Sequence, residues 1–521
     1  MSPDRRYDAI IIGAGHNGLV CAAMLARAGR SVLVLEAGAQ VGGCAITREF
    51  APGFRVSAGA HLLHQMPGAL IAELGLPAQG FSLAGQALPT TALAAGERAL
   101  AIGDTAVLAS HSAADGAAWP AFDAQLKRFA RMLHPLLAGI APRLGSDVWS
   151  DKAALLKLAV RMRLLGRRDM RELLRIIGMN AYDLLEDEFQ TDLLKGAVGL
   201  DAVLGTNFGP RSPGTVLTLL YRLAAELGAG PTGLAQPRGG LGALSDALAK
   251  AAAAAGANIR TGATVARISV TGDRASGVLL ASGEAIAADA VISNADAKST
   301  FFKLLGTEHL DTGFVRKVDH FRSRGVAAKV HLALDRLPPF AGIDARALRG
   351  RLLIAPSLDY VERAWNHVKY DETSPAPAFE ITVPTVNDPT LAPSGHHVLS
   401  AIVQYSPYAP TGGWNAARPA FTEAVLATLE AHAPGLRASI VASELMTPLD
   451  MEQEFRVSGG HWHHGDLAFD QFFMVRPVPG ATQHSTPLAG LYLCGASCHP
   501  GGGVMGIAGR NAARQLLAGA A

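Results

Sequence analysis

Cysteine and net charge are both scarce in this sequence. The 521 residues include only four cysteines, Cys21, Cys44, Cys494 and Cys498, which do not suggest a disulfide framework. The spacing of Cys494 and Cys498 suits a redox or metal pair, but no second pair accompanies them, so we expect free thiols in a reducing compartment. The formal net charge of +2 provides no overall positive field, which argues against nucleic-acid binding.

Long apolar runs are missing as well. No stretch approaches the roughly 18 uninterrupted apolar residues that can span a bilayer. The segment MSPDRRYDAIII enters an apolar strand almost at once and leaves no room for the apolar region of a signal peptide, so we expect a cytoplasmic protein. What the chain has in abundance is 57 glycines and 49% hydrophobic residues, which is typical of a packed α/β protein.

A glycine turn between a strand and a helix begins the chain. Residues 7–36 contain Gly13-x-Gly15-x-x-Gly18 after an apolar strand, and a second apolar strand ends at Glu36. In this context the spacing predicts dinucleotide binding: the glycines allow a tight turn, a close pyrophosphate and a closely packed helix, and the acid binds the ribose. The helix N-terminus then faces the phosphate charge.

A second glycine turn lies near the other end of the chain. Residues 491–517, LYLCGASCHPGGGVMGIAGRNAARQLL, predict a buried strand, a turn and a helix of small residues. A glycine run that enters a helix lets a ligand with acceptor oxygens approach the free helix N–H groups. The same pattern also turns a corner in any α/β protein, so this segment alone leaves both explanations open.

Five segments together resemble a known family. Residues 11–37, 236–257, 383–408, 459–473 and 491–513 are similar to the phytoene dehydrogenase-related flavoproteins, which belong to the amine oxidase-like superfamily and include carotenoid desaturases, carotenoid isomerases and retinol saturases. Within that family the chain most resembles the pyridine nucleotide-disulfide oxidoreductase domain-containing protein 2 group. Unlike true disulfide reductases, it has neither a C-x₄-C pair after the first glycine turn nor a second G-x-G-x-x-G for NAD(P)H.

The resemblance implies FAD as cofactor and an interleaved α/β fold. We expect a glutathione-reductase-like Rossmann FAD-binding domain made of residues 1–75, 235–300 and 455–521. An α+β substrate-binding domain with a helical insert is expected at 76–234 and 301–454.

The cofactor residues follow from the same resemblance. Gly42 and Gly43 match a loop that bends over FAD again, Val265 lies where a strand passes the adenine, and residues 287–297 match the last strand of the sheet. Near the C-terminus, helix N–H groups around Met505 and Gly506 are expected to face the flavin pyrimidine carbonyl. The residues predicted to contact FAD are Gly13, Ala14, Gly15, Asn17, Gly18, Glu36, Ala37, Gly42, Gly43, Val265, Gly495, Gly503, Met505 and Gly506.

Three residues are predicted to be catalytic: Lys329, His61 and His464. Histidines beside the flavin could move protons or orient substrate, or could simply form hydrogen bonds in their loops. Gly325 and Lys329 resemble the amine oxidase strand in which a lysine four residues after a glycine holds a water against flavin N5, a lysine that carotenoid desaturases in general lack. Strand alternation places Lys329 beside His331, facing either solvent or a cavity. No metal is expected.

The combined prediction is a FAD-dependent oxidoreductase. It would dehydrogenate or saturate a C–C or C–N bond of a largely apolar small molecule by hydride transfer with flavin N5, and oxygen, a quinone or another protein would serve as electron acceptor. Two alternatives remain open: a redox-neutral flavin-dependent isomerase of a polyene, and a binding or assembly protein that keeps FAD for stability.

One basic segment raises the question of a partner. Between residues 152 and 175, eight Lys and Arg side chains stand among leucines, with only Asp169 and Glu172 opposing them. Such a helix could lie on an anionic membrane surface. A solvated face, or a homo-oligomer contact, on a helix packed against its own domain is the alternative that we favour.

Overall fold

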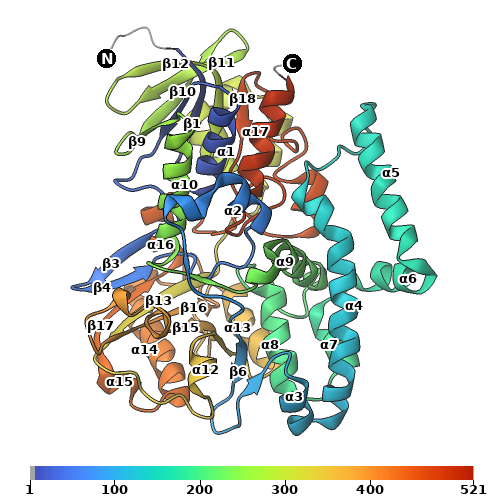
Figure 1. Ribbon diagram of the computed structural model, residues 1–521, viewed down its shortest axis with the longest axis vertical. Coiled ribbons are helices and arrows are strands. Elements are labelled where there is room, and N and C mark those ends of the chain that lie inside the picture. The colour runs from blue at the N-terminus through green and yellow to red at the C-terminus, as the bar shows by residue number, and fades with distance from the viewer. Residues whose placement is uncertain (1–5, 520–521) are drawn as a thin grey trace.

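The computed structural model describes residues 6–519, apart from the side chain of Pro231, and arranges them around two large sheets (Figure 1). The first sheet has the strand order β10-β11-β12-β1-β2-β9, and β18 pairs with β12. Strands β1, β2, β9, β12 and β18 run parallel, whereas β10, β11 and β12 are antiparallel neighbours. Their bounds are β1 Tyr7–Ile12, β2 Val32–Leu35, β9 Asn258–Arg260, β10 Val265–Thr271, β11 Arg274–Leu280, β12 Ala285–Ser293 and β18 Leu491–Leu493.

Both faces of this parallel region are covered, which explains its continuous apolar runs. Ile11 and Val34 face helices α1 (His16–Arg27), α10 (Leu241–Ala254) and α17 (Ile507–Gly519). Ile10 and Leu33 face the other way, toward a core that includes residues of β10 and β11. The chain therefore contributes to one sheet from its beginning, its middle and its end.

One detail of the predicted sheet is wrong. Residues 287–297 were expected to supply its last strand, but β12 lies in the interior, between β1 and β11. The strand that joins last along the chain is β18, which pairs with β12 through Val291 and Leu491. Parallel strands are joined through long crossovers, so chain order does not give their order in space.

The second sheet has the order β17-β13-β16-β15-β14-β6-β7 and is antiparallel except between β14 and β6. Its bounds are β6 Thr90–Leu93, β7 Leu100–Ala101, β13 Ala327–Leu334, β14 Arg351–Ile354, β15 Ala378–Thr382, β16 His397–Gln404 and β17 Ile440–Met446. One face is apolar and packs against Phe421 and Val425 of α14 (Trp414–His432). The other face carries polar side chains, and this difference positions the site described below.

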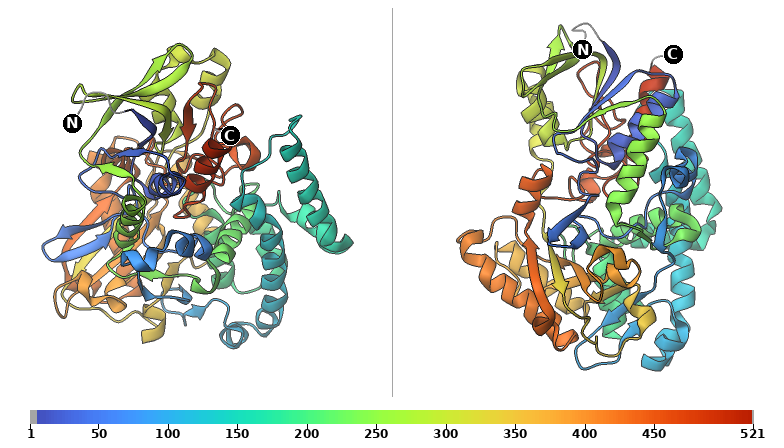
Figure 2. Two further views of the ribbon diagram at one scale, coloured as in Figure 1. Left: turned by 45° about the horizontal axis from the view of Figure 1, so that its top comes forward. Right: turned by 60° about the vertical axis from the view of Figure 1, so that its left-hand side comes forward.

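A helical insert covers one side of the molecule (Figure 1). It comprises α3 Thr105–His111, α4 Ala113–Ala138, α5 Trp149–Leu164, α6 Gly166–Ile176, α7 Ala181–Glu188, α8 Asp192–Val203 and α9 Thr215–Ala229. Most of these helices share a core with residues such as Phe129 and Leu220. Helices α5 and α6 contact this core on one side, through residues such as Met162 and Leu173, and stand out from the side of the molecule in both Figure 1 and the left view of Figure 2.

Smaller elements complete the fold. They are β3 Thr47–Ala51, β4 Phe54–Ser57, α2 Gly68–Leu74, β5 Leu83–Gly85, β8 Gln236–Pro237, α11 Thr312–Asp319, α12 Ala345–Leu348, α13 Leu358–Lys369, α15 Leu436–Ser439 and α16 Pro448–Phe455. The β3-β4 hairpin packs Phe54 and Val56 against Ala333 and Val398 of the second sheet. Of the helices in residues 6–519, none is long and apolar enough to cross a membrane. The predicted boundaries between the two domains stay a prediction.

Candidate active site

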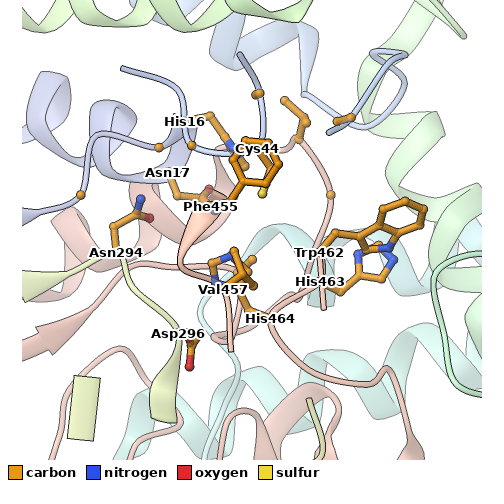
Figure 3. A pocket seen from close by; sticks show the side chains of 18 of the residues that line it. His16, Asn17, Cys44, Asn294, Asp296, Phe455, Val457, Trp462, His463 and His464 are labelled. Atoms are coloured by element: carbon orange, nitrogen blue, oxygen red, sulfur yellow. The ribbon is translucent and has the colours of Figure 1, made fainter. Parts of the chain in front are cut away.

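A cavity of about 510 Å³ is lined by residues of both sheets. Figure 3 shows part of its lining, with His16 and Asn17 above, Asn294 and Asp296 to one side, and Trp462 and His463 to the other. The first sheet and its loops contribute one end, which we call the dinucleotide end. The second sheet and the helical insert contribute the other, which we call the substrate end.

The dinucleotide end is built mainly from glycine backbone. Gly13 has a φ of +95°, a conformation that favours glycine. A Cβ on Gly15 would lie 2.7 Å from Nδ2 of Asn294, and a Cβ on Gly18 would lie 2.3 Å from the carbonyl oxygen of Gly13. Larger residues would therefore close the turn and push α1 away from it.

The second glycine pair lies directly against the first turn. The Gly42 N–H donates to the Ala14 carbonyl at 2.8 Å, and Gly43 has a φ of +58°. Gly42, Gly43 and Gly15 all line the cavity. Gly15 and the pair Gly42 and Gly43, nearly thirty positions apart in the sequence, thus form one backbone surface.

Glu36 lies at this same end. Its carboxylate accepts the Ala14 N–H at 2.7 Å and the Gly38 N–H at 2.8 Å, and its side chain lines the cavity together with Ala37 and Val265. Because a carboxylate has about four lone-pair sites, Glu36 retains acceptor capacity for the hydroxyl groups of a ribose.

Two polar atoms beside the glycine turn are left for a ligand. His16 Nε2 and Asn17 Oδ1 are buried, have no hydrogen-bond partner in the described part of the chain, and belong to residues that line the cavity. Burial lowers the pKa of His16 to about 4, so its ring is neutral. Orphaned buried polar atoms next to a glycine cradle are what a bound dinucleotide would satisfy, so the residues present fit FAD.

The C-terminal glycine turn reaches the cavity through Gly503 and Val504. A Cβ on Gly503 would lie 1.8 Å from Oε1 of Gln65. Met505 instead packs in the core of the helical insert, and its N–H donates to the Gly503 carbonyl at 3.0 Å. Ala14, Gly18, Gly495, Met505 and Gly506 do not line the cavity, so their direct contact with FAD stays a prediction.

The substrate end begins with a row of residues across the second sheet. Lys329 on β13 is the register partner of Ile402 on β16, which in turn is the register partner of Glu380 on β15. Such partners point to the same face of a sheet, and neighbouring strands lie about 4.8 Å apart. Ile402 and Glu380 both line the cavity, so this is the face that the cavity meets.

Buried charges surround Glu380. Arg351 of β14 forms ion pairs with both Glu380 and Asp201, and Arg222 lies 3.6 Å from Asp201 and 3.1 Å from Glu226. Burial by itself would raise the pKa of Glu380, but Arg351 and the His61 hydrogen bond outweigh burial and hold the pKa well below its usual range. Glu380 is therefore ionised.

The Glu380 carboxylate fixes the predicted catalytic residue His61. Nε2 of His61 lies 2.9 Å from Oε1 of Glu380, and since the carboxylate can only accept, Nε2–H is the donor. The other ring nitrogen, Nδ1, is buried without a partner among the described residues, and His61 lines the cavity. Burial, and secondarily Lys329, lower the pKa of His61 to about 4, so the ring presents a neutral acceptor.

Lys329 is fully buried, so the solvent-facing alternative is wrong. Its Nζ has no hydrogen-bond partner among the described residues, and burial lowers its pKa to about 7 while Glu380 opposes that shift. Lys329 does not itself line the cavity, although its row partner Ile402 does. Its contact with flavin N5 stays a prediction.

His464, the third predicted catalytic residue, lines the cavity on the wall that also carries Trp462 and His463. It has a φ of +53°, and burial lowers its pKa to about 4. Its Nδ1 has no partner among the described residues. Of the three predicted residues, the structure thus brings His61 and His464 to the cavity and places Lys329 beside His61. No group of three or more His, Cys, Asp or Glu side chains within residues 6–519 is arranged to hold a metal ion.

Several functional candidates were not recognised in the sequence. Glu380, Asp201 and Arg222 make up the polar wall of the substrate end, Arg351 pairs with the first two, and Asn294 lies against the first glycine turn. The sequence did contain a signal for this charge cluster. The segments AFEIT and RLLI each carry a single charged residue, Glu380 and Arg351, in an otherwise mostly apolar strand, and a buried charge requires a partner.

Comparison with known proteins identifies the group to which this architecture belongs. Residues 18–517 match the model of the flavin containing amine oxidoreductases. The pyridine nucleotide-disulfide oxidoreductase domain-containing protein 2 of Mus musculus is 35% identical over 98% of this chain and 93% of its own length. A limonene dehydrogenase polypeptide of Castellaniella defragrans is 27% identical over 99% of this chain and 95% of its own.

A solved structure shows the same fold. An oxidoreductase from Methanosarcina mazei superposes with a TM-score of 0.62 at 20% identity, over 98% of this chain and 99% of the other. The predicted α/β fold class with a Rossmann-type FAD-binding part is confirmed, as are the predicted superfamily and cofactor. The chain belongs to the flavin containing amine oxidoreductase family, and its cofactor is FAD.

Proposed function

We propose that this protein dehydrogenates or saturates a C–C or C–N bond of a small, largely apolar substrate that binds at the substrate end of the cavity. FAD, when bound, supplies the acceptor or donor of hydride at flavin N5. The observation that carries the proposal is the continuity of one cavity from Gly13 and Gly43 to Glu380 and Ile402. A substrate beside Ile402 would share that cavity with the cofactor.

The walls of the substrate end favour an apolar molecule with one polar group. Leu204, Leu467, Ile402 and Trp462 provide apolar surface that would exclude water from the reacting bond. His61 offers Nδ1 as a hydrogen-bond acceptor, held in orientation by Glu380. The polar group of the substrate would donate to this nitrogen and so be positioned within the cavity.

Two side chains of the chain itself have separate roles, one toward the proton and one toward the substrate. A pKa of about 7 lets Lys329 exist in both protonation states near neutral pH. His61, whose pKa is about 4, accepts a hydrogen bond without retaining a proton. In this proposal Lys329 takes up or releases the proton that accompanies hydride transfer, and His61 orients the substrate.

One relative supports the chemistry. The limonene dehydrogenase polypeptide matches nearly the whole chain and is named for the dehydrogenation of limonene, a hydrocarbon. We infer that a protein with this fold can oxidise C–H bonds of an apolar carbon skeleton. The buried polar wall at Glu380 and Arg222 adds a requirement that a pure hydrocarbon would not satisfy.

The test is anaerobic mixing of the purified holoprotein with a panel of apolar alcohols, amines and alkenes while the flavin absorbance is recorded. Bleaching of oxidised flavin, or reoxidation of reduced flavin, by a panel member supports the proposal. The Glu380→Gln variant should slow that change at least about tenfold, or about 1.4 kcal/mol of barrier. Glu284→Gln, at an exposed ion pair with Arg260, serves as the matched control.

Two results would contradict the proposal. Formation of an isomer with no net change in flavin oxidation state would favour a redox-neutral isomerase. If no compound of the panel changes the absorbance of either oxidised or reduced flavin, a role in which FAD serves only to stabilise the protein is favoured.

A further inference from the structure

The exposed apolar side chains of this protein are concentrated in one place. Seven of the ten large hydrophobic side chains exposed in the described part of the chain lie between residues 144 and 174. We call residues 144–176 the helical arm; it contains α5 and α6 and projects from the side of the molecule (Figures 1 and 2). An exposed apolar patch of this kind marks an interaction surface.

The apolar side chains of α5 form a stripe on its outer face. Trp149, Leu156, Val160 and Leu164 are 76%, 61%, 48% and 78% exposed. With about 100° of rotation per residue, these four positions fall within an arc of about 80°. The face that packs on the protein, with Leu158 and Met162, lies on the opposite side of the helix. The stripe is therefore not part of the protein's own core.

Basic side chains flank the stripe on both sides. By the same rotation, Lys152 and Arg163 fall on one side of it and Lys157 and Arg161 on the other. All four side chains are exposed. Among the described residues, Lys152 is paired with Asp147, whereas none of the salt bridges involves Lys157, Arg161 or Arg163. An apolar stripe between two rows of mostly unpaired cations is complementary to a surface with anionic groups above an apolar layer.

The charge of the arm is also distinct from that of the rest of the chain. Residues 152–175 carry eight basic and two acidic side chains, a net charge of +6, whereas the whole chain carries +2. The remainder of the chain is therefore net negative. The arm would therefore be drawn toward an anionic surface, which gives the molecule a defined orientation there.

The arm is fixed in place at both ends. At its base, Gln483 donates one hydrogen bond to Asp151 and another to the Ala141 carbonyl, both at 2.9 Å. At its far side, Arg128 of α4 pairs with Asp169 of α6 at 2.9 Å. The outward stripe is thus presented by a braced helix.

We propose that the helical arm is a docking surface for an anionic lipid bilayer, with the Trp149–Leu164 stripe inserted between the headgroups and the flanking Lys and Arg side chains on the lipid phosphates. A second copy of the chain fits less well, because pairing two arms would bring like charges together. Nucleic acid would leave the apolar stripe without a partner. Docking on a membrane would also let the apolar substrate proposed above enter from the lipid, although the docking does not depend on that function.

The experiment is co-sedimentation of the holoprotein with vesicles of phosphatidylcholine alone or with one quarter phosphatidylglycerol. We expect binding to the anionic vesicles, weaker binding to the neutral ones, and release as salt screens the charges. The apolar double variant Leu156→Gln/Leu164→Gln and the charge-reversal variant Arg161→Glu/Arg163→Glu should each lower the partition coefficient more than tenfold. Flavin content and thermal unfolding confirm that each variant is folded.

Matched controls lie outside the arm. Val441→Gln removes an equally exposed apolar side chain from β17, and Lys250→Glu reverses an exposed charge on α10. Both should bind vesicles as the natural protein does. Equal recovery in the supernatant with and without anionic vesicles at low salt would overturn the proposal. So would a dimer, detected by light scattering without vesicles, that the Leu156→Gln/Leu164→Gln variant dissociates.

Discussion

The two ends of the cavity are built from different parts of the polypeptide. At the dinucleotide end, glycine backbone at Gly13, Gly15 and Gly42 forms the wall. At the substrate end, side chains form the wall, and they come from β15, α8, α9 and the loop that carries His61. A backbone wall suits a cofactor whose shape is shared across a family, whereas a wall of side chains can change with the substrate.

The difference extends to electrostatics. At the dinucleotide end the carboxylate of Glu36 lines the cavity, and His16 is neutral. The substrate end buries Arg351, Glu380 and Asp201 in contact with one another. Breaking a group of buried charges leaves an uncompensated ion, so substitutions at this end should affect stability as well as chemistry.

The largest effect is expected from breaking the charge cluster of the substrate end. Arg351→Met would remove one of the two cations, Arg351 and Arg222, that lie against both Glu380 and Asp201, and should lower the free energy of unfolding by about 3–5 kcal/mol. Chemical denaturation of the holoprotein measures this. Arg336→Met, at an exposed pair with Asp335, is the control and should cost at most about 1 kcal/mol. Equal stability of the two variants would show that the cluster is not structural.

At the dinucleotide end, a substitution in the glycine turn should weaken cofactor binding. A side chain in Gly15→Val would meet Nδ2 of Asn294 and occupy the space through which the pyrophosphate reaches the backbone. We expect FAD to bind at least about 100-fold more weakly, about 2.8 kcal/mol, as measured by flavin titration of the apoprotein. Gly178→Val, where a Cβ meets nothing within 4 Å, is the control. Retention of a full complement of FAD by Gly15→Val would refute the assigned turn.

A smaller effect, on the rate of flavin chemistry and not on FAD binding, is expected from substituting Lys329. Lys329→Met keeps much of the length of the side chain and should retain FAD, because Lys329 does not line the cavity. We expect flavin reduction or reoxidation to slow at least about tenfold, or about 1.4 kcal/mol of barrier, because at its predicted place near N5 the Lys329 cation would stabilise charge on reduced flavin. Stopped-flow reoxidation after photoreduction measures this without a known substrate. Unchanged rates in both half reactions would return Lys329 to a structural role.

The smallest expected effect concerns pH and the same lysine. The pKa of Lys329 is about 7 in the folded protein, against an ordinary value of 10.5. Between these two values the unfolded chain binds a proton that the folded protein does not, so this lysine makes stability rise with pH over that window. Lys329→Met should therefore gain stability relative to the natural protein, by at least about 1 kcal/mol near pH 6, and the gain should shrink toward pH 10. Denaturation curves at several pH values test this, and a gain independent of pH would contradict the shifted pKa.

The two ends also differ in how much of them could be predicted. The spacing of Gly13, Gly15 and Gly18 and the acid at Glu36 predicted the dinucleotide end, because a tight turn and a close helix need glycine at fixed positions along a continuous segment. Gly42, Gly43 and Val265 were found through family resemblance, and all three line the cavity. The exposed stripe of α5 was only partly predicted, since the sequence shows its basic residues but not which face the protein covers.

The sequence by itself determined the α/β class and the glycine turn with its acid between two apolar strands, because each depends on residues near one another in the chain. Only the tertiary structure decided that β12 lies in the interior of its sheet, that Lys329, Ile402 and Glu380 form one row, and that Arg351 joins Glu380 to Asp201. Arg351 and Asp201, for example, are 150 positions apart in the chain. Such contacts depend on strand register and on the cost of burying unpaired charge, and neither is a property of any local segment.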